Sequence, residues 1–134
     1  MSQLPLLNTN EISSAKFSSC RTYRYSLTRI WDDSKETCVF IGLNPSTADE
    51  NDDDPTIRRC IRFAKDWGFG RLVMVNLFSY RATDPKVMKS TPHPIGDDND
   101  KHLLAECGKA QLVVAAWGNH GGHLNRSFDV LNLL

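Results

Sequence analysis

Residues 38–47 read Cys-Val-Phe-Ile-Gly-Leu-Asn-Pro-Ser-Thr, an apolar run that ends abruptly in glycine, an amide, proline and two hydroxyl groups. This pattern is typical of a buried strand that delivers polar groups to a site at its carboxyl end. Two more apolar runs end in the same way, residues 72–76 at an asparagine and residues 112–120 at Trp-Gly-Asn-His. Because the carboxyl ends of parallel strands meet at one edge of a sheet, the three runs predict one shared site there.

The totals are those of an ordinary globular domain. The 134 residues suffice for one core, and the 16 basic and 16 acidic residues give zero net charge, which disfavours strong non-specific binding to nucleic acid. No apolar run approaches the ~20 residues that span a bilayer, and the polar start lacks a signal pattern, so we expect a cytoplasmic protein. The four widely spaced cysteines predict free buried thiols and disfavour a disulfide framework or a zinc site.

Strands and helices are predicted to alternate after a loose, Ser-rich lead-in over residues 1–20. The expected order is an early strand with alternating Tyr23, Tyr25 and Leu27, a strand at 37–43, a helix from Pro55 capped by Asp53 or Asp54, a strand at 72–77, a helix near 98–107, a strand at 111–117 and a last helix near Asn125. This order predicts one α/β domain over residues 21–134, a three-layer sandwich with a mainly parallel central sheet. The apolar ending carries no helix stop signal, as expected of a chain truncated before a final strand.

Two asparagines are the leading candidates for chemistry. Asn44 precedes Pro45 in a tight turn, where its amide could position a water as nucleophile or could simply stabilise the turn. Asn76 ends the second apolar run, where its paired donor and acceptor could read the edge of a base or could tie the strand to the next loop.

Neighbouring residues supply further candidates for substrate binding. Gly42 and Pro45 shape the turn around Asn44. Ser46 and Thr47, with their backbone N–H groups, could cradle an anion or could cap the loop. The next candidates could stack a base and contact a phosphate, or could be core aromatics beside a solvated guanidinium; they are Phe78, Tyr80 and Arg81.

The third apolar run ends in a group that we expect to form one wall of the cleft, consisting of Trp117, Gly118, Asn119 and His120. His120 is the candidate that faces the cleft as a catalytic residue. Two histidines without a third ligand nearby are weak support for a metal, and the aspartates of residues 49–54 do not match a calcium loop. We therefore expect no metal and no cofactor.

Several of these segments resemble an uncharacterised bacterial and phage family catalogued as domain of unknown function 1643. The resemblance spans roughly residues 21–134. It rests on residues 42–48, 54–59, 75–78, 80–85 and 116–118.

A more distant similarity is to the uracil-DNA glycosylase superfamily. Residues 42–45 match the superfamily's Gly-x-Asn-Pro motif, which holds the attacking water, and residues 73–76 resemble its strand that ends in a base-recognising asparagine. Residues 114–118 resemble its strand that ends in Trp-Gly, whereas its last His-Pro motif has no counterpart because His93-Pro94 comes too early. The resemblance implies an α/β fold and a base-sized pocket more strongly than it implies catalysis.

These residues and the resemblance predict a glycosylase-like protein with a pocket for a nucleobase or nucleotide, which hydrolyses an N-glycosidic bond in nucleic acid after base flipping. Asn44 would position water, Asn76 would read the base, Phe78 would stack on it and Arg81 would meet phosphate. Two alternatives stay open. One is a non-catalytic module that binds a nucleotide or modified nucleic acid, and the other is a structural or interaction domain.

Overall fold

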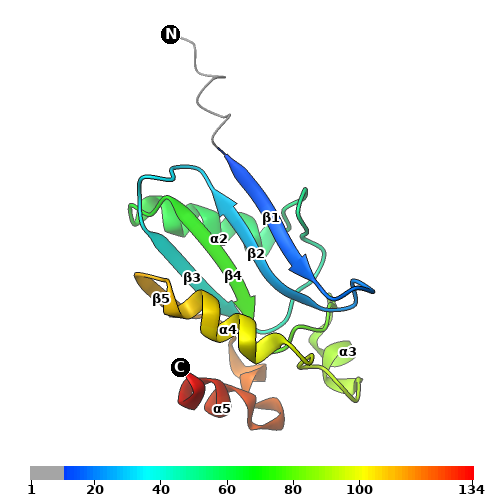
Figure 1. Ribbon diagram of the computed structural model, residues 1–134. Helices are drawn as coiled ribbons and strands as arrows, with labels where there is room; N and C mark the ends of the chain where they lie inside the picture. The colour runs from blue at the N-terminus through cyan, green and yellow to red at the C-terminus, as the bar shows by residue number, and fades with distance from the viewer. Residues whose placement is uncertain (1–10) are drawn as a thin grey trace.

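A five-stranded mixed sheet forms the centre of the computed structural model, which describes residues 11–134 (Figure 1). Its strands lie in the order β1-β2-β4-β3-β5, and their bounds are β1 (Ile12–Phe17), β2 (Arg24–Ile30), β3 (Thr37–Gly42), β4 (Arg71–Asn76) and β5 (Leu112–Ala115). β3 pairs in parallel with β4 and β5, whereas β2 pairs antiparallel with both β1 and β4. The α/β class is confirmed, but the sheet as a whole is mixed and not mainly parallel.

β1 lies inside the stretch for which the sequence predicted a loose lead-in. It pairs with β2 over the register from Ile12 opposite Ile30 to Phe17 opposite Arg24, so it is held mainly by backbone hydrogen bonds at the sheet edge. Its side chains are mostly small, polar and exposed, and therefore give no clear alternation in the sequence. The short connection from β1 to β2 allows only an antiparallel pair, because a parallel crossover needs a dozen or more residues. Residues 1–10 of the expected lead-in lie outside the described residues.

A bulge in β2 changes which face its first residue points to. Lys16 pairs with Ser26 and Phe17 with Arg24, so Tyr25 is an extra residue on the β2 side. The sequence alternation predicts Tyr25 and Leu27 on one face. In the structure Leu27 packs in the core beneath the helix that begins at Pro55, whereas Tyr25 stacks on His102 at the other face. The bulge thereby turns Arg24 toward the same face as Leu27.

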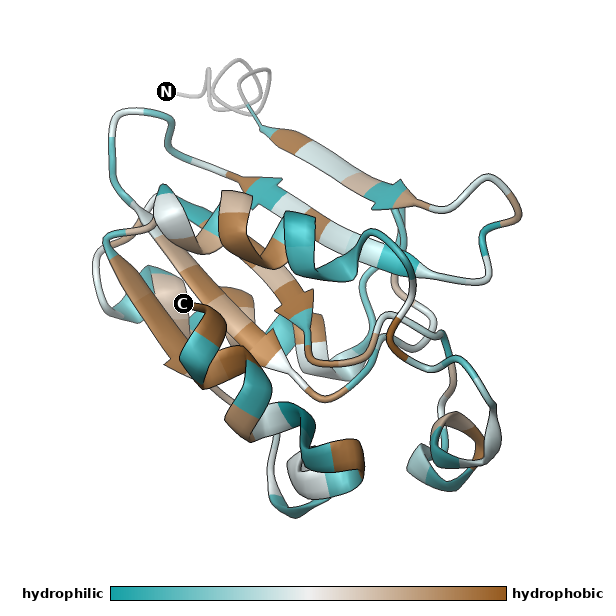
Figure 2. Cartoon of the chain, turned by 60° about the horizontal axis from the view of Figure 1, so that its bottom comes forward, coloured by the Kyte–Doolittle hydropathy of each residue, from teal (hydrophilic) through white to brown (hydrophobic). Residues whose placement is uncertain are grey.

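Helices cover both faces of the sheet. One face packs against α2 (Pro55–Asp66), and the other packs against α4 (Asn99–Gly108) and α5 (Arg126–Leu133). Figure 2 shows the central strands as the most hydrophobic part of the chain, in keeping with their burial between these helices. Two short elements complete the described chain, α3 (Pro85–Ser90) and the 3₁₀ segment η2 (Asn119–Asn125). No helix of the described part is long and apolar enough to cross a membrane.

α2 begins where the sequence predicts it to begin. Asp54 is the N-cap, its Oδ1 accepts a hydrogen bond from the backbone N–H of Ile57 at 2.9 Å, and Pro55 opens the first turn. Oδ2 of the same carboxylate accepts a hydrogen bond from the N–H of Ala48 at 3.3 Å. One buried side chain therefore fixes both the start of α2 and the loop that follows β3.

Replacing the cap should weaken the fold measurably. We expect Asp54→Ala to lower the free energy of unfolding by about 1–2 kcal/mol, because two backbone N–H groups lose their acceptor. Urea denaturation followed by circular dichroism measures the change. Asp52→Ala removes an exposed carboxylate from the same loop and serves as the matched control. Equal stability of the two variants would contradict the assignment of Asp54 as cap.

Candidate active site at the carboxyl ends of the central strands

A cavity of about 410 Å³ opens where β3 and β4 end. Its polar lining consists of Asn44, Asn76, Thr56 and Arg59. Its other lining residues are apolar side chains, a thiol and a glycine, namely Phe40, Gly42, Leu43, Cys60, Phe63, Met74, Pro85 and Ala116. The structure thus brings together Gly42, Asn44 and Asn76, the three residues that the strand ends placed at one edge.

Asn76 is almost completely buried, with 2% of its surface exposed. Its Oδ1 accepts a hydrogen bond from Nη2 of Arg24 at 3.4 Å, and its backbone carbonyl accepts one from Nδ2 of Asn99 at 2.9 Å. A Cβ added at Gly42 would lie 2.8 Å from Nδ2 of Asn76, so the glycine makes room for this amide. Within residues 11–134 no protein acceptor pairs with Nδ2. Asn76 therefore offers its N–H donors to the cavity, while its oxygen is held from behind.

The donor behind Asn76 is a buried guanidinium that the sequence analysis missed. Arg24 is 2% exposed, and its Nη1 donates to the carbonyl of Ala48 at 3.1 Å. Burial lowers the pKa of Arg24 to about 10, with Asp54 opposing the shift, so the side chain stays charged at neutral pH. Among the described residues no carboxylate lies within 4 Å of it. Arg24 opens a strand that reads Arg-Tyr-Ser-Leu-Thr-Arg-Ile, and these four polar residues give no sign in the sequence that the guanidinium is buried.

Asn44 holds the turn after β3 and leaves one group free. Its Nδ2 donates to the carbonyl of Ala82 at 2.8 Å, with longer contacts to the carbonyls of Pro45 at 3.1 Å and Tyr80 at 3.4 Å. The turn-stabilising role is therefore present. Oδ1 has no protein donor in the described part of the chain, so it is the atom of Asn44 that can accept a hydrogen bond from a ligand or a water.

A second, shallower hollow of about 480 Å³ gathers most of the remaining polar candidates. It is lined by Arg21, Thr22, Ser46, Thr47, Tyr80, Arg81, Ala82 and Thr83. The hydroxyls of Ser46 and Thr83 lie 2.9 Å apart, and Nε of Arg81 donates to the carbonyl of Ser46 at 3.3 Å. Pro45 lies in the chain between Asn44, which lines the first cavity, and Ser46, which lines the hollow. It is buried, and its carbonyl accepts a hydrogen bond from the N–H of Ala82 at 2.8 Å.

Phe78 does not line either hollow. It is fully buried in the core on the α4 face, and its ring lies 5.6 Å from that of His123. It therefore cannot stack on a ligand without leaving the core. Phe63 is the aromatic side chain that α2 contributes to the cavity instead.

The end of the third apolar run also leaves the cavity. β5 stops at Ala115, sooner than predicted, and Gly118 has a φ of +70°. Of this run only Ala116 reaches the cavity. Trp117 packs against the core and lies directly over Gly121. The next residues, Gly118, Asn119 and His120, are exposed, and Nδ1 of His120 lies 3.1 Å from Nζ of Lys89.

Four lining residues come from one helix and were missed from the sequence. Thr56, Arg59, Cys60 and Phe63 follow the spacing i, i+3, i+4 and i+7 along α2. That spacing was the available signal, but only the helix itself was predicted from this stretch of sequence. Arg59 is the single charged group of the cavity.

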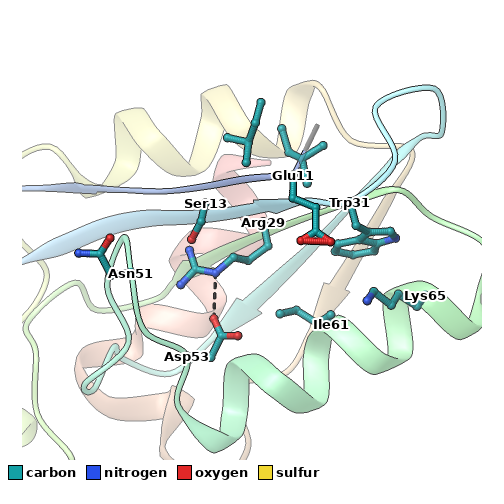
Figure 3. Close-up of a pocket in the computed structure, with 10 residues that line it drawn as sticks. Glu11, Ser13, Arg29, Trp31, Asn51, Asp53, Ile61 and Lys65 are labelled. Carbon is teal, nitrogen blue, oxygen red and sulfur yellow. Dashed lines mark hydrogen bonds and ion pairs between the residues drawn. The ribbon is translucent and has the colours of Figure 1, made fainter. Parts of the chain in front are cut away.

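A third cavity, of about 340 Å³, lies between β1, β2 and α2 (Figure 3). Arg29 crosses it and pairs with Asp53 at 2.8 Å, and its Nη2 donates to the carbonyl of Asp49 at 2.6 Å. None of the residues proposed from the sequence lines this cavity. Arg29 and Asp53 are thereby engaged in holding the acidic loop. Across residues 11–134, no three His, Cys, Asp or Glu side chains gather as a metal site requires.

The four cysteines are free, and they differ sharply in environment. Cys38 and Cys60 are buried as predicted, and burial raises the pKa of each thiol to about 11. Cys20 is exposed, contrary to the prediction of buried thiols. Hydrogen bonds with Ser18 and Thr22 lower the pKa of Cys20 to about 7.

The model of a family described as "Protein of unknown function (DUF1643)" matches residues 24–134. No curated protein and no solved structure matches the chain. The description of this family names no activity.

Selective alkylation of Cys20 tests the electrostatics of the β1–β2 connection. Because its thiolate forms near pH 7, we expect iodoacetamide to modify Cys20 first, with a rate that is half-maximal near pH 7. Thr22→Val removes a hydrogen bond to the thiolate and should move this midpoint upward. Peptide mapping by mass spectrometry measures both. A Cys20 that reacts no faster than Cys38 or Cys60 at pH 7 would contradict the assignment.

Proposed function

We propose, for a chain that belongs to the DUF1643 family, that the cavity at the ends of β3 and β4 binds a nucleobase. The observation that carries the proposal is the meeting of Asn44 and Asn76 in one cavity with a largely apolar lining. A site of this kind binds the faces of a planar heterocycle through apolar contact and its edge through a few polar groups.

The two amides support this proposal because they present opposite hydrogen-bonding groups. Arg24 occupies Oδ1 of Asn76 and leaves Nδ2 as a donor, whereas three backbone carbonyls occupy Nδ2 of Asn44 and leave Oδ1 as an acceptor. A nucleobase edge carries both carbonyl or ring-nitrogen acceptors and N–H donors. The volume of about 410 Å³ lies within the range of small-molecule sites.

We further propose that the bound base is cleaved from its sugar. A water that donates a hydrogen bond to Oδ1 of Asn44 would attack the anomeric carbon. The glycosidic C–N bond would break, and its electron pair would leave with the base. Nδ2 of Asn76 and the guanidinium of Arg59 would stabilise the negative charge on the departing base, and the proton released by water would finally neutralise it. The resemblance of residues 42–45 to a water-holding motif supports this role for Asn44.

One observation favours the alternative of binding without turnover. The cavity lining contains amides, a hydroxyl, a guanidinium and a thiol, but no carboxylate and no histidine among the described residues. Burial raises the pKa of the thiol, Cys60, to about 11, so it is a poor proton acceptor at neutral pH. Without a strong base, a water held by an amide is positioned but barely activated. The same cavity would then serve a binding module.

Two single substitutions separate the two functions. The assays are saturable binding of bases, nucleosides and nucleotides, and release of free base from single- and double-stranded DNA that carries uracil or other altered bases. We expect Asn76→Ala to weaken binding about tenfold or more, since a buried hydrogen bond is lost. We expect Asn44→Ala to abolish release while leaving binding within a few-fold, because its role is to hold water.

The control is Asn132→Ala, which changes an exposed asparagine on α5. Because Asn44 also holds the turn, the melting temperature of each variant is measured alongside. Binding that depends on Asn76, with no release by any form, would retire hydrolysis and establish the binding module. No saturable binding of any base, nucleoside or nucleotide would overturn the proposal and favour a structural domain.

A further inference from the structure

We propose that the hollow around Arg81 is a phosphate subsite beside the base cavity, so that the ligand class is a nucleotide and not a free base or a nucleoside. This inference rests on the proposed function, whose base cavity supplies the other half of the ligand. The phosphate could belong to a free nucleotide or to a nucleic-acid strand, since both present the same anionic oxygens. The two arginines of the hollow, its hydroxyl groups and its position support this assignment.

The guanidinium of Arg81 is held in place by hydrogen bonds and still has unused N–H donors. Its Nε donates to the carbonyl of Ser46 and its Nη1 to the carbonyl of Arg21, both at 3.3 Å. Its Cζ lies 4.8 Å from the centre of the Phe17 ring. Among residues 11–134 no carboxylate comes within 4 Å of it, and Nη2 has no protein acceptor. A fixed guanidinium with unused donors is the preferred partner of phosphate in proteins.

Arg21 brings a second guanidinium to the same aromatic ring. Its Cζ lies 3.9 Å from the centre of Phe17, and Glu50 pairs with it at 2.8 Å. The backbone of Arg21 has a φ of +61°, which L-residues other than asparagine and aspartate rarely adopt. Glycine would adopt this φ with less strain. Arg21 therefore has a strained backbone at the position from which its guanidinium reaches the hollow. Glu50 accepts hydrogen bonds from both Nη1 and Nη2 of Arg21, so Arg81 is the guanidinium of this pair that has no carboxylate partner among the described residues.

Hydroxyl groups complete the hollow. Thr22, Ser46, Thr47 and Thr83 line it together with the two arginines, and none of its described lining residues is acidic. Hydroxyl groups and backbone N–H groups donate readily to phosphate oxygens. Two carboxylates interact with these arginines. Glu50 pairs with Arg21, and the pKa of Asp49 is lowered by hydrogen bonds from the backbone of Asp52 and Asn51 and further by Arg21 and Arg81.

The hollow adjoins the base cavity through the turn after β3. Asn44 lines the base cavity and Ser46 lines the hollow, and the Cα atoms of two residues so spaced lie at most about 7.6 Å apart. Nδ2 of Asn44 also donates to the carbonyls of Tyr80 and Ala82, which flank Arg81. The side chain of Asn44 therefore contacts the walls of both hollows. A site for a base joined to a phosphate requires two such adjacent hollows.

The first test uses inorganic phosphate alone and so does not depend on base binding. Backbone amide NMR shifts of Thr47 and Thr83 are followed as phosphate is added to the full chain. We expect a saturable shift in the wild type and at least a tenfold weaker midpoint in Arg81→Gln, because a charged hydrogen-bond donor is lost. Arg62→Gln, an exposed charge on α2, is the matched control and should titrate like the wild type.

Arg21→Gly guards against a merely structural explanation. Glycine accepts the positive φ, so this variant should melt no lower than the wild type, yet it should bind phosphate roughly three- to tenfold more weakly. No saturable shift in the wild type, or unchanged midpoints in Arg81→Gln and Arg21→Gly, would overturn the subsite whether or not a base binds.

The second test compares a nucleoside with its 5′-monophosphate and with a short single-stranded oligonucleotide. We expect phosphorylation or incorporation into the strand to raise affinity about tenfold or more, and Arg81→Gln to remove that gain. A gain for the strand alone would assign the phosphate to nucleic acid. Equal affinities for nucleoside, monophosphate and oligonucleotide would overturn the inference while leaving the base cavity intact. Phosphate binding through Arg81 without any binding of base would instead reject the proposed function and leave only an anion site.

Discussion

The buried guanidinium of Arg24 joins the three segments that build the candidate site. It comes from β2, donates to Ala48 in the loop after β3, and donates to Asn76 at the end of β4. Burying this cation is costly, as its lowered pKa shows, and the bulge at Tyr25 is what turns it inward. Removing it would leave two buried oxygens without a donor, so the site and the local fold depend on the same contact.

This contact determines which hydrogen-bonding group of Asn76 faces the cavity. Because Arg24 holds the oxygen of Asn76, the amide nitrogen faces the cavity past Gly42, where no Cβ obstructs it. On the neighbouring strand end, backbone carbonyls hold the nitrogen of Asn44 and leave its oxygen free. Each amide is thus fixed by the groups behind it before any ligand arrives. Fixed donors and acceptors of this kind are what the proposed base site requires.

The three apolar runs were enough to predict the parallel strands β3, β4 and β5 and the edge at which their ends meet. Burial on both faces explains the continuous apolar pattern of β3 and β4, whereas β5 at the sheet edge is apolar although its side chains are largely exposed. The same reasoning missed β1, whose exposed small side chains carry no pattern, and it misplaced Phe78 and Trp117. An aromatic side chain after a strand looks the same in the sequence whether it enters a cleft or the core. Arg24 and Arg59 were missed because a bulge and a helix face, not proximity in the chain, bring them to the site.

The most direct measurement is a crystal structure of the protein with a nucleoside 5′-monophosphate. We expect the base in the cavity between Asn44 and Asn76, with one of its acceptor atoms within hydrogen-bond distance of Nδ2 of Asn76. A ligand bound at another place, such as the cavity between β1 and α2, or a strand-end cavity that holds only water at saturating ligand, would contradict the account.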